Sequence, residues 1–200
     1  MRKTCYRAAK RLLDVVLALP AVVLLLLPWA VIACIIKLQS PGPAVYKPKR
    51  VGLNGKEFTL YKFRSMRVDS GRIRATTLRG DDRIFPFGRF LRNSKLDETL
   101  QLINILKGEM SIIGPRPILP EEYNDFPGKE QYAARFDVTP GLFCTVDVDY
   151  RAAAERKLQF EMDTDYAKNI TLRGDLKVFF GVIKTVVSGE NVYKEEEHDK

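Results

Sequence analysis

An apolar stretch near the N-terminus constrains this chain more than any other feature. The run from Val15 to Ile36 contains no charged residue. As a helix it is long enough to cross the hydrocarbon core of a bilayer, which takes about 20 residues. A secretory signal peptide fits poorly, because the run is too long and no clear small-residue cleavage site follows it. We therefore predict a membrane helix in residues 1–39.

The prolines and the basic flanks of this run favour a helix that enters the membrane and returns. Pro20 and Pro28 lie inside the run, and proline removes a backbone donor and kinks a helix. Basic residues stand on both sides: Arg2, Lys3, Arg7, Lys10 and Arg11 before it, and Lys37, Lys47, Lys49 and Arg50 after it. The positive-inside tendency places both flanks in the cytoplasm. We predict a re-entrant helix, with a plain spanning helix as the alternative.

Composition limits the partners and the chemistry of the remaining chain. The 200 residues suit one domain, and the net charge of +8 favours an anionic partner such as nucleic acid, anionic lipid or a phosphorylated substrate. The three cysteines are scattered, with no metal-ligand spacing and no even count, which indicates a reducing, cytosol-facing protein without disulfides. The single histidine, in the charged C-terminal tail, argues against a histidine triad or a zinc site.

A β-hairpin is predicted after the membrane helix. Residues 44–53 and 56–63 have strand character and flank Asn54-Gly55, a type I′ turn signal. In the second strand, Lys62 continues the apolar face of Phe58 and Leu60. The pattern alone favours an exposed strand end for Lys62. The alternative is a cation aimed at a carboxylate or a phosphate.

The remaining segments predict a mostly helical α+β fold. Arginines alternate with aromatic residues over 83–92, which suits an interfacial helix and, more weakly, a nucleic-acid surface. Residues 67–83 read as a polar loop, 111–117 as a rigid turn and 142–148 as a strand. Helices are predicted over 121–136, interrupted at Pro127-Gly128, over 152–168, and over 176–187 as an amphipathic helix. We expect a catalytic domain over 40–190 and a charged tail over 191–200.

The acidic pair Asp97-Glu98 is the leading candidate for chemistry. Ser94 looks like the cap of a helix that carries Asp97 in its first turn and stops at Gly108. Acids are common in a first helical turn for dipole reasons alone, and the pattern by itself favours that explanation. The same position would lower the pKa of Asp97 and attract pyrophosphate. A nucleophilic Asp97 with Mg²⁺ offsetting the two charges is the functional alternative.

Arg116 is the candidate phosphate ligand. It stands between Pro115 and Pro117, which fix its backbone, and a guanidinium forks onto phosphate oxygens. The alternative is an arginine that braces the turn. The sequence contains neither G-x-x-x-x-G-K-[ST] nor G-x-G-x-x-G, which argues against P-loop and dinucleotide enzymes.

Three ordered motifs resemble a known family. They are KFRSM over 62–66, KLDETLQLIN over 95–104 and GEMSIIGPRP over 108–117. With the apolar segment before them, they resemble the bacterial sugar transferases, or monotopic phosphoglycosyl transferases, over nearly the whole chain. The resemblance implies a re-entrant anchor in the bacterial inner membrane and a small catalytic domain on the cytoplasmic face.

The resemblance also implies a reaction. An aspartate matching Asp97 attacks the β-phosphate of a UDP-sugar, UMP leaves, and undecaprenyl phosphate takes the sugar phosphate from the aspartyl intermediate. Mg²⁺ is required, with Asp97 as its protein ligand, and Glu98 is the second catalytic carboxylate. The substrate-binding positions are Lys62, Arg64, Arg116, Pro117 and Asp163. The expected partners are the UDP-sugar, the polyprenyl phosphate and inner-membrane lipid, and not nucleic acid; the sequence leaves a homodimer open.

This chain departs from the family in two places. Leu27-Pro28 stands where Ser-Pro is usual, and residues 139–145 lack the arginine and tryptophan of the usual Arg-Pro-Gly-[IL]-Thr-Gly-Trp segment. The second departure leaves the sugar open. We expect a minimal catalytic unit without fused domains. Two other functions stay as alternatives: a phospholipid-headgroup transferase, which would need several spanning helices, and a non-catalytic basic membrane adaptor, which leaves the motifs unexplained.

Overall fold

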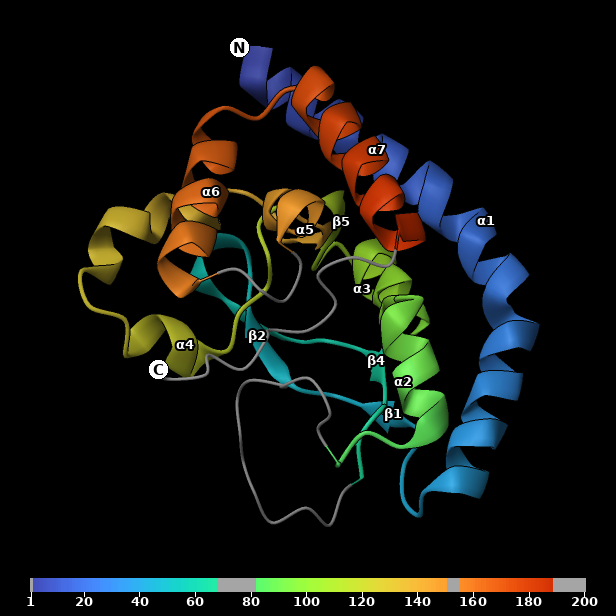
Figure 1. Cartoon of the computed structure of the whole chain (residues 1–200). Coiled ribbons are helices and arrows are strands. Elements are labelled where there is room, and N and C mark those ends of the chain that lie inside the picture. Colours follow the sequence, from blue (N-terminus) through green and yellow to red (C-terminus); the bar gives the residue numbers. More distant parts are fainter. Residues whose placement is uncertain (1, 68–81, 151–154, 189–200) are drawn as a thin grey trace.

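The computed structural model describes residues 2–67, 82–150 and 155–188. Its longest element is α1, Arg2–Gln39, a single helix that contains Pro20 and Pro28 and bends along its length (Figure 1). Among the described residues it is the one helix long and apolar enough to cross a membrane. The predicted long apolar helix is present, and its place in a membrane and its re-entrant course stay predictions.

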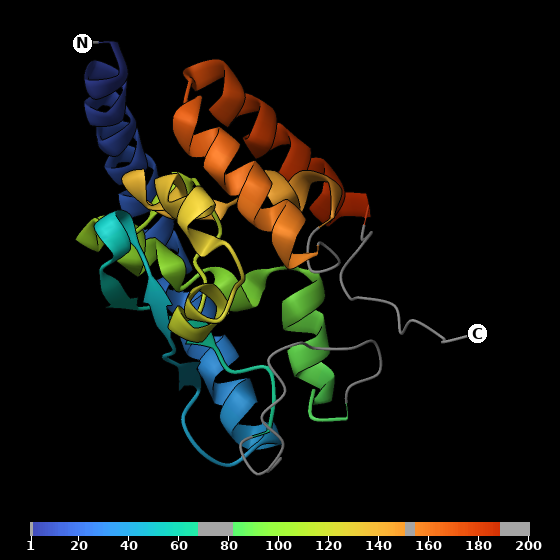
Figure 2. The ribbon, with the colours of Figure 1, turned by 90° about the vertical axis from the view of Figure 1, so that its left-hand side faces the viewer.

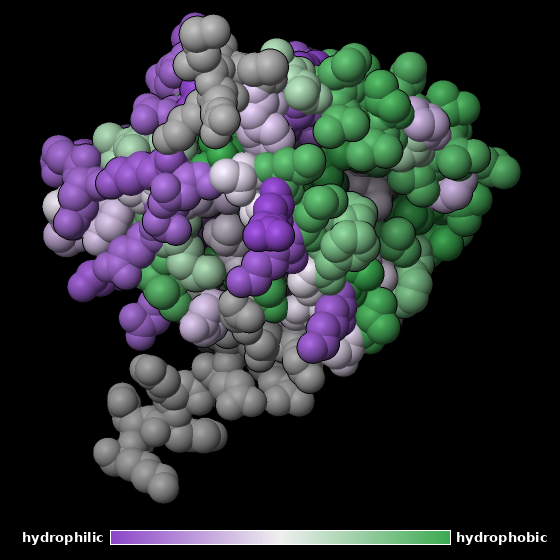
Figure 3. All heavy atoms as spheres, turned by 90° about the horizontal axis from the view of Figure 1, so that it is seen from above, coloured by the Kyte–Doolittle hydropathy of each residue, from purple (hydrophilic) through white to green (hydrophobic). Residues whose placement is uncertain are grey.

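The two sides of α1 have different surroundings. Ala18, Trp29, Ile32 and Ile36 are buried against the rest of the chain, whereas large apolar side chains such as Leu24 and Leu27 are exposed. Contacts with the folded body reach from one end of α1 to the other. The Tyr6 hydroxyl donates to Asp175 at 2.7 Å, and the Phe87 N–H donates to Gln39 at 3.0 Å. Hydrophobic residues gather on the side of the molecule where α1 runs, and hydrophilic ones on the opposite side (Figure 3).

The predicted hairpin is confirmed, in two separately paired segments. β2 (Lys49–Val51) pairs antiparallel with β3 (Glu57–Thr59), and β1 (Val45–Tyr46) pairs antiparallel with β4 (Lys62–Phe63). The turn over η1 (Leu53–Gly55) has φ of 56° at Asn54 and 72° at Gly55, as a type I′ turn requires. The ladder breaks near Pro48, because proline has no N–H to donate.

The predicted helix start at Ser94 is wrong. Ser94 follows α2 (Pro86–Asn93) and its hydroxyl donates back to the Phe90 carbonyl at 2.8 Å, so it ends one helix instead of beginning the next. A short 3₁₀ turn, η2 (Leu96–Glu98), comes next, and α3 begins only at Gln101. α3 (Gln101–Lys107) ends at Gly108, with φ of 82°, as predicted.

Two segments around the next strand pair also differ from the prediction. β5 (Ser111–Ile113) is a strand rather than part of a turn, and it pairs parallel with β6 (Gly141–Phe143). The strand predicted over 142–148 gives way to the short helix α5 (Thr145–Asp149). The residue pattern of 142–148 is apolar enough for either element, so the pairing of β6 with β5 decides where the strand ends.

The C-terminal half is helical, as predicted. α4 (Pro120–Asn124) and η3 (Lys129–Asp137) are separated at Pro127-Gly128. α6 (Arg156–Lys168) packs on η3 around the buried ring of Phe160, which contacts the rings of Tyr132 and Phe126. α6 and α7 (Leu172–Ser188) lie on either side of the short helix α5 in Figure 1, and both contact it. Figure 2 shows both helices in the upper part of the molecule. The α7 helix exposes one apolar stripe: Leu172, Leu176, Phe180, Ile183 and Val187. The predicted charged tail and all but the ends of the polar loop lie outside the described residues.

Candidate active site

Asp97 and Glu98 lie in η2, facing the end of the hairpin. Lys62, in β4, places its Nζ 2.9 Å from Asp97 Oδ2 and 3.3 Å from Glu98 Oε1. The favoured interpretation of Lys62 as an exposed strand end is therefore wrong, since its side chain is only 22% exposed and bridges two carboxylates. Residues that are adjacent in the 3₁₀ turn thus share one cation.

Buried contacts fix the position of this pair. The Asn104 amide of α3 donates to the Thr59 carbonyl at 2.7 Å, and its oxygen accepts the Tyr61 N–H at 3.0 Å. This ties the hairpin to α3 and sets Lys62 over η2. The Trp29 indole of α1 donates to the Thr99 hydroxyl at 2.9 Å, directly after Glu98. The membrane helix, the hairpin and α3 therefore all meet at the acidic pair.

Arg116 reaches the same cluster through a carboxylate that the sequence reading missed. Its Nη1 lies 3.0 Å from Oδ1 of Asp147 in α5. The other Asp147 oxygen lies 3.1 Å from Lys95 Nζ, which is 3.9 Å from Glu98 Oε2. Asp147 falls in a segment read as a strand, and no motif marked it. The cluster therefore consists of three cations and three carboxylates: Lys62, Lys95, Arg116, Asp97, Glu98 and Asp147.

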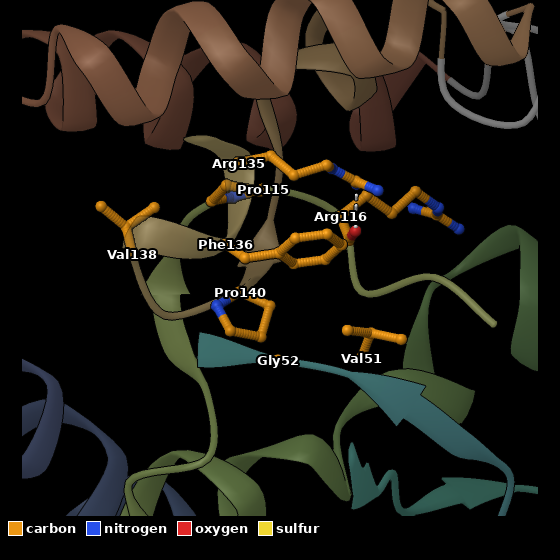
Figure 4. A pocket seen from close by; sticks show the side chains of 8 residues that line it. All are labelled: Val51, Gly52, Pro115, Arg116, Arg135, Phe136, Val138 and Pro140. Atoms are coloured by element: carbon orange, nitrogen blue, oxygen red, sulfur yellow. Dashed lines mark hydrogen bonds between the residues drawn. The ribbon is translucent and has the colours of Figure 1, made fainter. Parts of the chain in front are cut away.

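Asp163 joins the site through the backbone of Arg116. It is fully buried, and its Oδ1 accepts the Arg116 N–H at 3.2 Å. Its Oδ2 pairs with Arg135 at 2.5 Å, and Arg135 also donates to the Arg116 carbonyl at 2.9 Å. Figure 4 shows Arg135 and Arg116 side by side at a small cavity that Pro115 also lines. Pro117 directly follows Arg116 in the chain. Asp163 and Arg135 thus hold the loop that carries Arg116.

Arg64 lies apart from the acidic pair. Its guanidinium donates to the carbonyl of Ser40, at 2.5 Å, and to that of Pro41. Arg64 therefore ties the end of α1 to the hairpin. A direct contact between Arg64 and substrate stays a prediction.

Burial and charge act differently on the two adjacent carboxyls. Burial raises the pKa of Asp97, with Lys62 opposing and Glu98 reinforcing the shift. The lowering predicted from a helix start is therefore wrong, since no α-helix begins there and desolvation dominates. For Glu98 burial acts in the same direction, but Lys62, Lys95 and Arg116 outweigh it and lower its pKa. Asp147 raises the pKa of Arg116. Glu98 is thus held ionised, whereas the pKa of Asp97 is raised and Lys62 limits that rise.

A divalent cation fits this site only together with a substrate. No group of three or more His, Cys, Asp or Glu side chains that could hold a metal occurs among the described residues. Mg²⁺ commonly uses one or two carboxylates and takes its other ligands from phosphates and water. Asp97 and Glu98 match that donor set.

Comparison with known proteins shows the family of this chain. The family model described as bacterial sugar transferase matches residues 5–189. The chain belongs to the bacterial sugar transferase family. Within this family it is 37% identical over 193 residues to the UDP-glucose:undecaprenyl-phosphate glucose-1-phosphate transferase of Caulobacter vibrioides, covering 92% of this chain and 72% of the relative.

The relatives do not all carry the same sugar in their names. A putative undecaprenyl-phosphate N-acetylgalactosaminyl 1-phosphate transferase of Bacillus subtilis is 44% identical over 131 residues, which are 63% of this chain and 73% of the relative. The UDP-glucose:undecaprenyl-phosphate glucose-1-phosphate transferase of Escherichia coli is 35% identical over 188 residues, which are 87% of this chain and 39% of the relative. Similarity at this level therefore does not select a sugar.

Proposed function

We propose that this sugar transferase moves a sugar phosphate from a UDP-sugar to undecaprenyl phosphate through a phosphosugar-aspartyl intermediate. A carboxylate oxygen of Asp97 attacks the β-phosphorus, the bond from that phosphorus to the bridging oxygen breaks, and UMP leaves. A phosphate oxygen of the lipid then attacks the same phosphorus and releases Asp97. The product is an undecaprenyl-diphosphate sugar, the first lipid-linked intermediate of glycan assembly.

The observation that carries the proposal is that the Asp97 carboxylate is buried and contacts the Lys62 ammonium. A desolvated carboxylate is a stronger nucleophile than a hydrated one, and Lys62 at 2.9 Å favours its ionised form. Arg116 and Lys95 add positive charge where the phosphates would collect negative charge. Glu98, which stays ionised, is the second catalytic carboxylate. When bound, Mg²⁺ would be held by Asp97 with the donor phosphates and would offset the negative charge of the donor diphosphate and of the leaving UMP.

The surroundings of α1 support the proposed placement in the membrane. Its outer side is apolar, and its inner side contacts the folded body from Tyr6 to Gln39. A plain spanning helix would leave the folded body on one side of the bilayer, clear of the hydrocarbon core. Contact along the whole helix therefore supports a monotopic, re-entrant anchor. We propose that it lies in the bacterial inner membrane with Asp97 on the cytoplasmic face, where the UDP-sugar is soluble and the lipid is at hand.

Intact-protein mass spectrometry tests the chemistry directly. The purified protein in nanodiscs is incubated with Mg²⁺ and a panel of UDP-sugars in the absence of lipid acceptor. We expect a sugar-phosphate adduct that maps to Asp97, is missing in Asp97→Asn, and is lost when undecaprenyl phosphate is added. An adduct on another residue, or UMP release that survives in Asp97→Asn, would contradict the proposed nucleophile. A chain that releases no UMP from any donor, with lipid present, would contradict the transfer itself.

A further inference from the structure

Asp147 is a buried carboxylate that contacts two cations of the site through its side chain, which is 1% exposed. Its two oxygens serve different partners: Oδ1 faces Arg116 Nη1 at 3.0 Å and Oδ2 faces Lys95 Nζ at 3.1 Å. These two cations come from segments far apart in the sequence, the turn before η2 and the loop after β5. Asp147 therefore holds two parts of the site in one arrangement.

The backbone of Lys95 is strained in this arrangement. Lys95 has φ of 57°, one of two non-glycine residues with positive φ among those described. A lysine in the left-handed region costs about 1 kcal/mol or more and persists only where the surroundings enforce it. Its side chain is 14% exposed, and its nearest charged partner is Asp147. The strained residue directly precedes η2, so the position of Lys95 and that of Asp97 are linked through the chain.

Part of the Arg116 guanidinium does not contact Asp147 and is accessible to a ligand. Only Nη1 contacts Asp147, and the side chain is 33% exposed although its neighbours Asp147 and Asp163 are buried. Because the guanidinium is planar, fixing one nitrogen on Asp147 fixes the direction of the remaining N–H groups. The Arg116 backbone is held at the same time by Asp163 and Arg135.

We propose that Asp147 is a positioning residue for the donor diphosphate. It keeps Arg116 and Lys95 directed at the phosphates and prevents them from collapsing onto Asp97 and Glu98 when no donor is bound. The inference rests on the proposed function, since it assigns these cations to the donor. The segment over 139–145, which departs from the family pattern, directly precedes and begins α5, the helix that carries Asp147.

The charge and the geometry of Asp147 predict opposite effects, which makes Asp147→Asn decisive. If Asp147 mattered only as a negative charge, its removal would make the site more cationic and lower the KM for the UDP-sugar. If it positions Arg116 and Lys95, the KM rises and kcat/KM for UMP release falls, on the order of tenfold to a hundredfold. We expect the second result.

The design separates this proposal from a folding defect and from the proposed function. Asp175→Asn is the matched control, since Asp175 is also a buried carboxylate, with Lys10 at 2.5 Å and two tyrosine hydroxyls as partners. It should lower the thermal midpoint and leave the donor KM unchanged. The Asp147→Asn change should also add little to Arg116→Gln, because it acts partly through that arginine. An unchanged or lower donor KM in Asp147→Asn would overturn the positioning role. If the wild-type protein still releases UMP in the same assay, the proposed function is unaffected by that result.

Discussion

Lys62 Nζ lies 2.9 Å from Asp97 Oδ2, in a site where burial raises the pKa of Asp97 and Lys62 opposes that shift. One ammonium from the end of the hairpin thus favours the ionised form of the proposed nucleophile against the effect of burial. The relationship joins residues 35 positions apart in the chain and gives the pH dependence of the first step its expected sign.

Replacing Lys62 by methionine should slow UMP release and shift its pH profile. Without the ammonium the pKa of Asp97 rises further, so the loss of rate on acidification begins at a higher pH than in the wild type. We expect a decrease of roughly 10²- to 10³-fold near neutral pH. Lys107→Met is the control, since Lys107 pairs with Glu109 at 2.7 Å and is 45% exposed. An acid limb at the same pH in Lys62→Met would exclude this role.

Asp163 should give the protein a pH-dependent stability. Burial raises its pKa from 3.8 to about 6, with Arg135 opposing. Between these values the folded chain keeps a proton that the unfolded chain has lost, so stability decreases as pH rises through the window and is level above it. The change is roughly 3 kcal/mol at about 1.4 kcal/mol per pKa unit.

Thermal unfolding of the wild type and of Asp163→Asn, followed by circular dichroism from pH 4 to pH 7, checks this prediction. The asparagine variant cannot titrate at this position. The stability of the wild type relative to the variant should therefore decline up to about pH 6 and then stay constant. A difference that is constant over the whole range would show that Asp163 does not titrate there.

Gly141→Ala should separate the strands that carry the Arg116 loop. A Cβ at Gly141 would lie 2.0 Å from the Gly114 backbone nitrogen, so β5 and β6 could not stay paired. We expect a loss of about 1–3 kcal/mol or more in stability, together with weaker donor binding. Gly174→Ala is the control, where the nearest atom is the Thr171 hydroxyl at 3.1 Å. Unfolding midpoints of both variants decide the matter, and equal midpoints would contradict the close packing.

The course of α1 can be tested by labelling single cysteines. In a chain with its native cysteines replaced, Arg7→Cys and Lys47→Cys place thiols at exposed positions on either side of the apolar run. A re-entrant helix predicts that an impermeant maleimide reaches both from the cytoplasmic face only. Leu27→Cys, on the exposed apolar side, should stay unlabelled in the bilayer. Labelling of positions 7 and 47 from opposite faces would establish a plain span.

The sequence by itself determined the local features of this protein. The uncharged run of apolar residues predicted α1, Asn54-Gly55 predicted the turn, and Gly108 predicted the end of α3. Each of these features depends on one continuous stretch of chain. The motifs around Asp97 and Arg116 led to the family. Only the tertiary structure decided how the site is built.

Ser94 ends a helix instead of starting one, because its hydroxyl bonds back to the Phe90 carbonyl in the preceding turn. Lys62 is a partly buried partner of two carboxylates instead of an exposed strand end, because folding places η2 against the hairpin. Asp147 could not be recognised in sequence at all. Its importance comes from two partners, Lys95 and Arg116, that folding brings to either side of one buried carboxylate, and no spacing along the chain encodes that meeting.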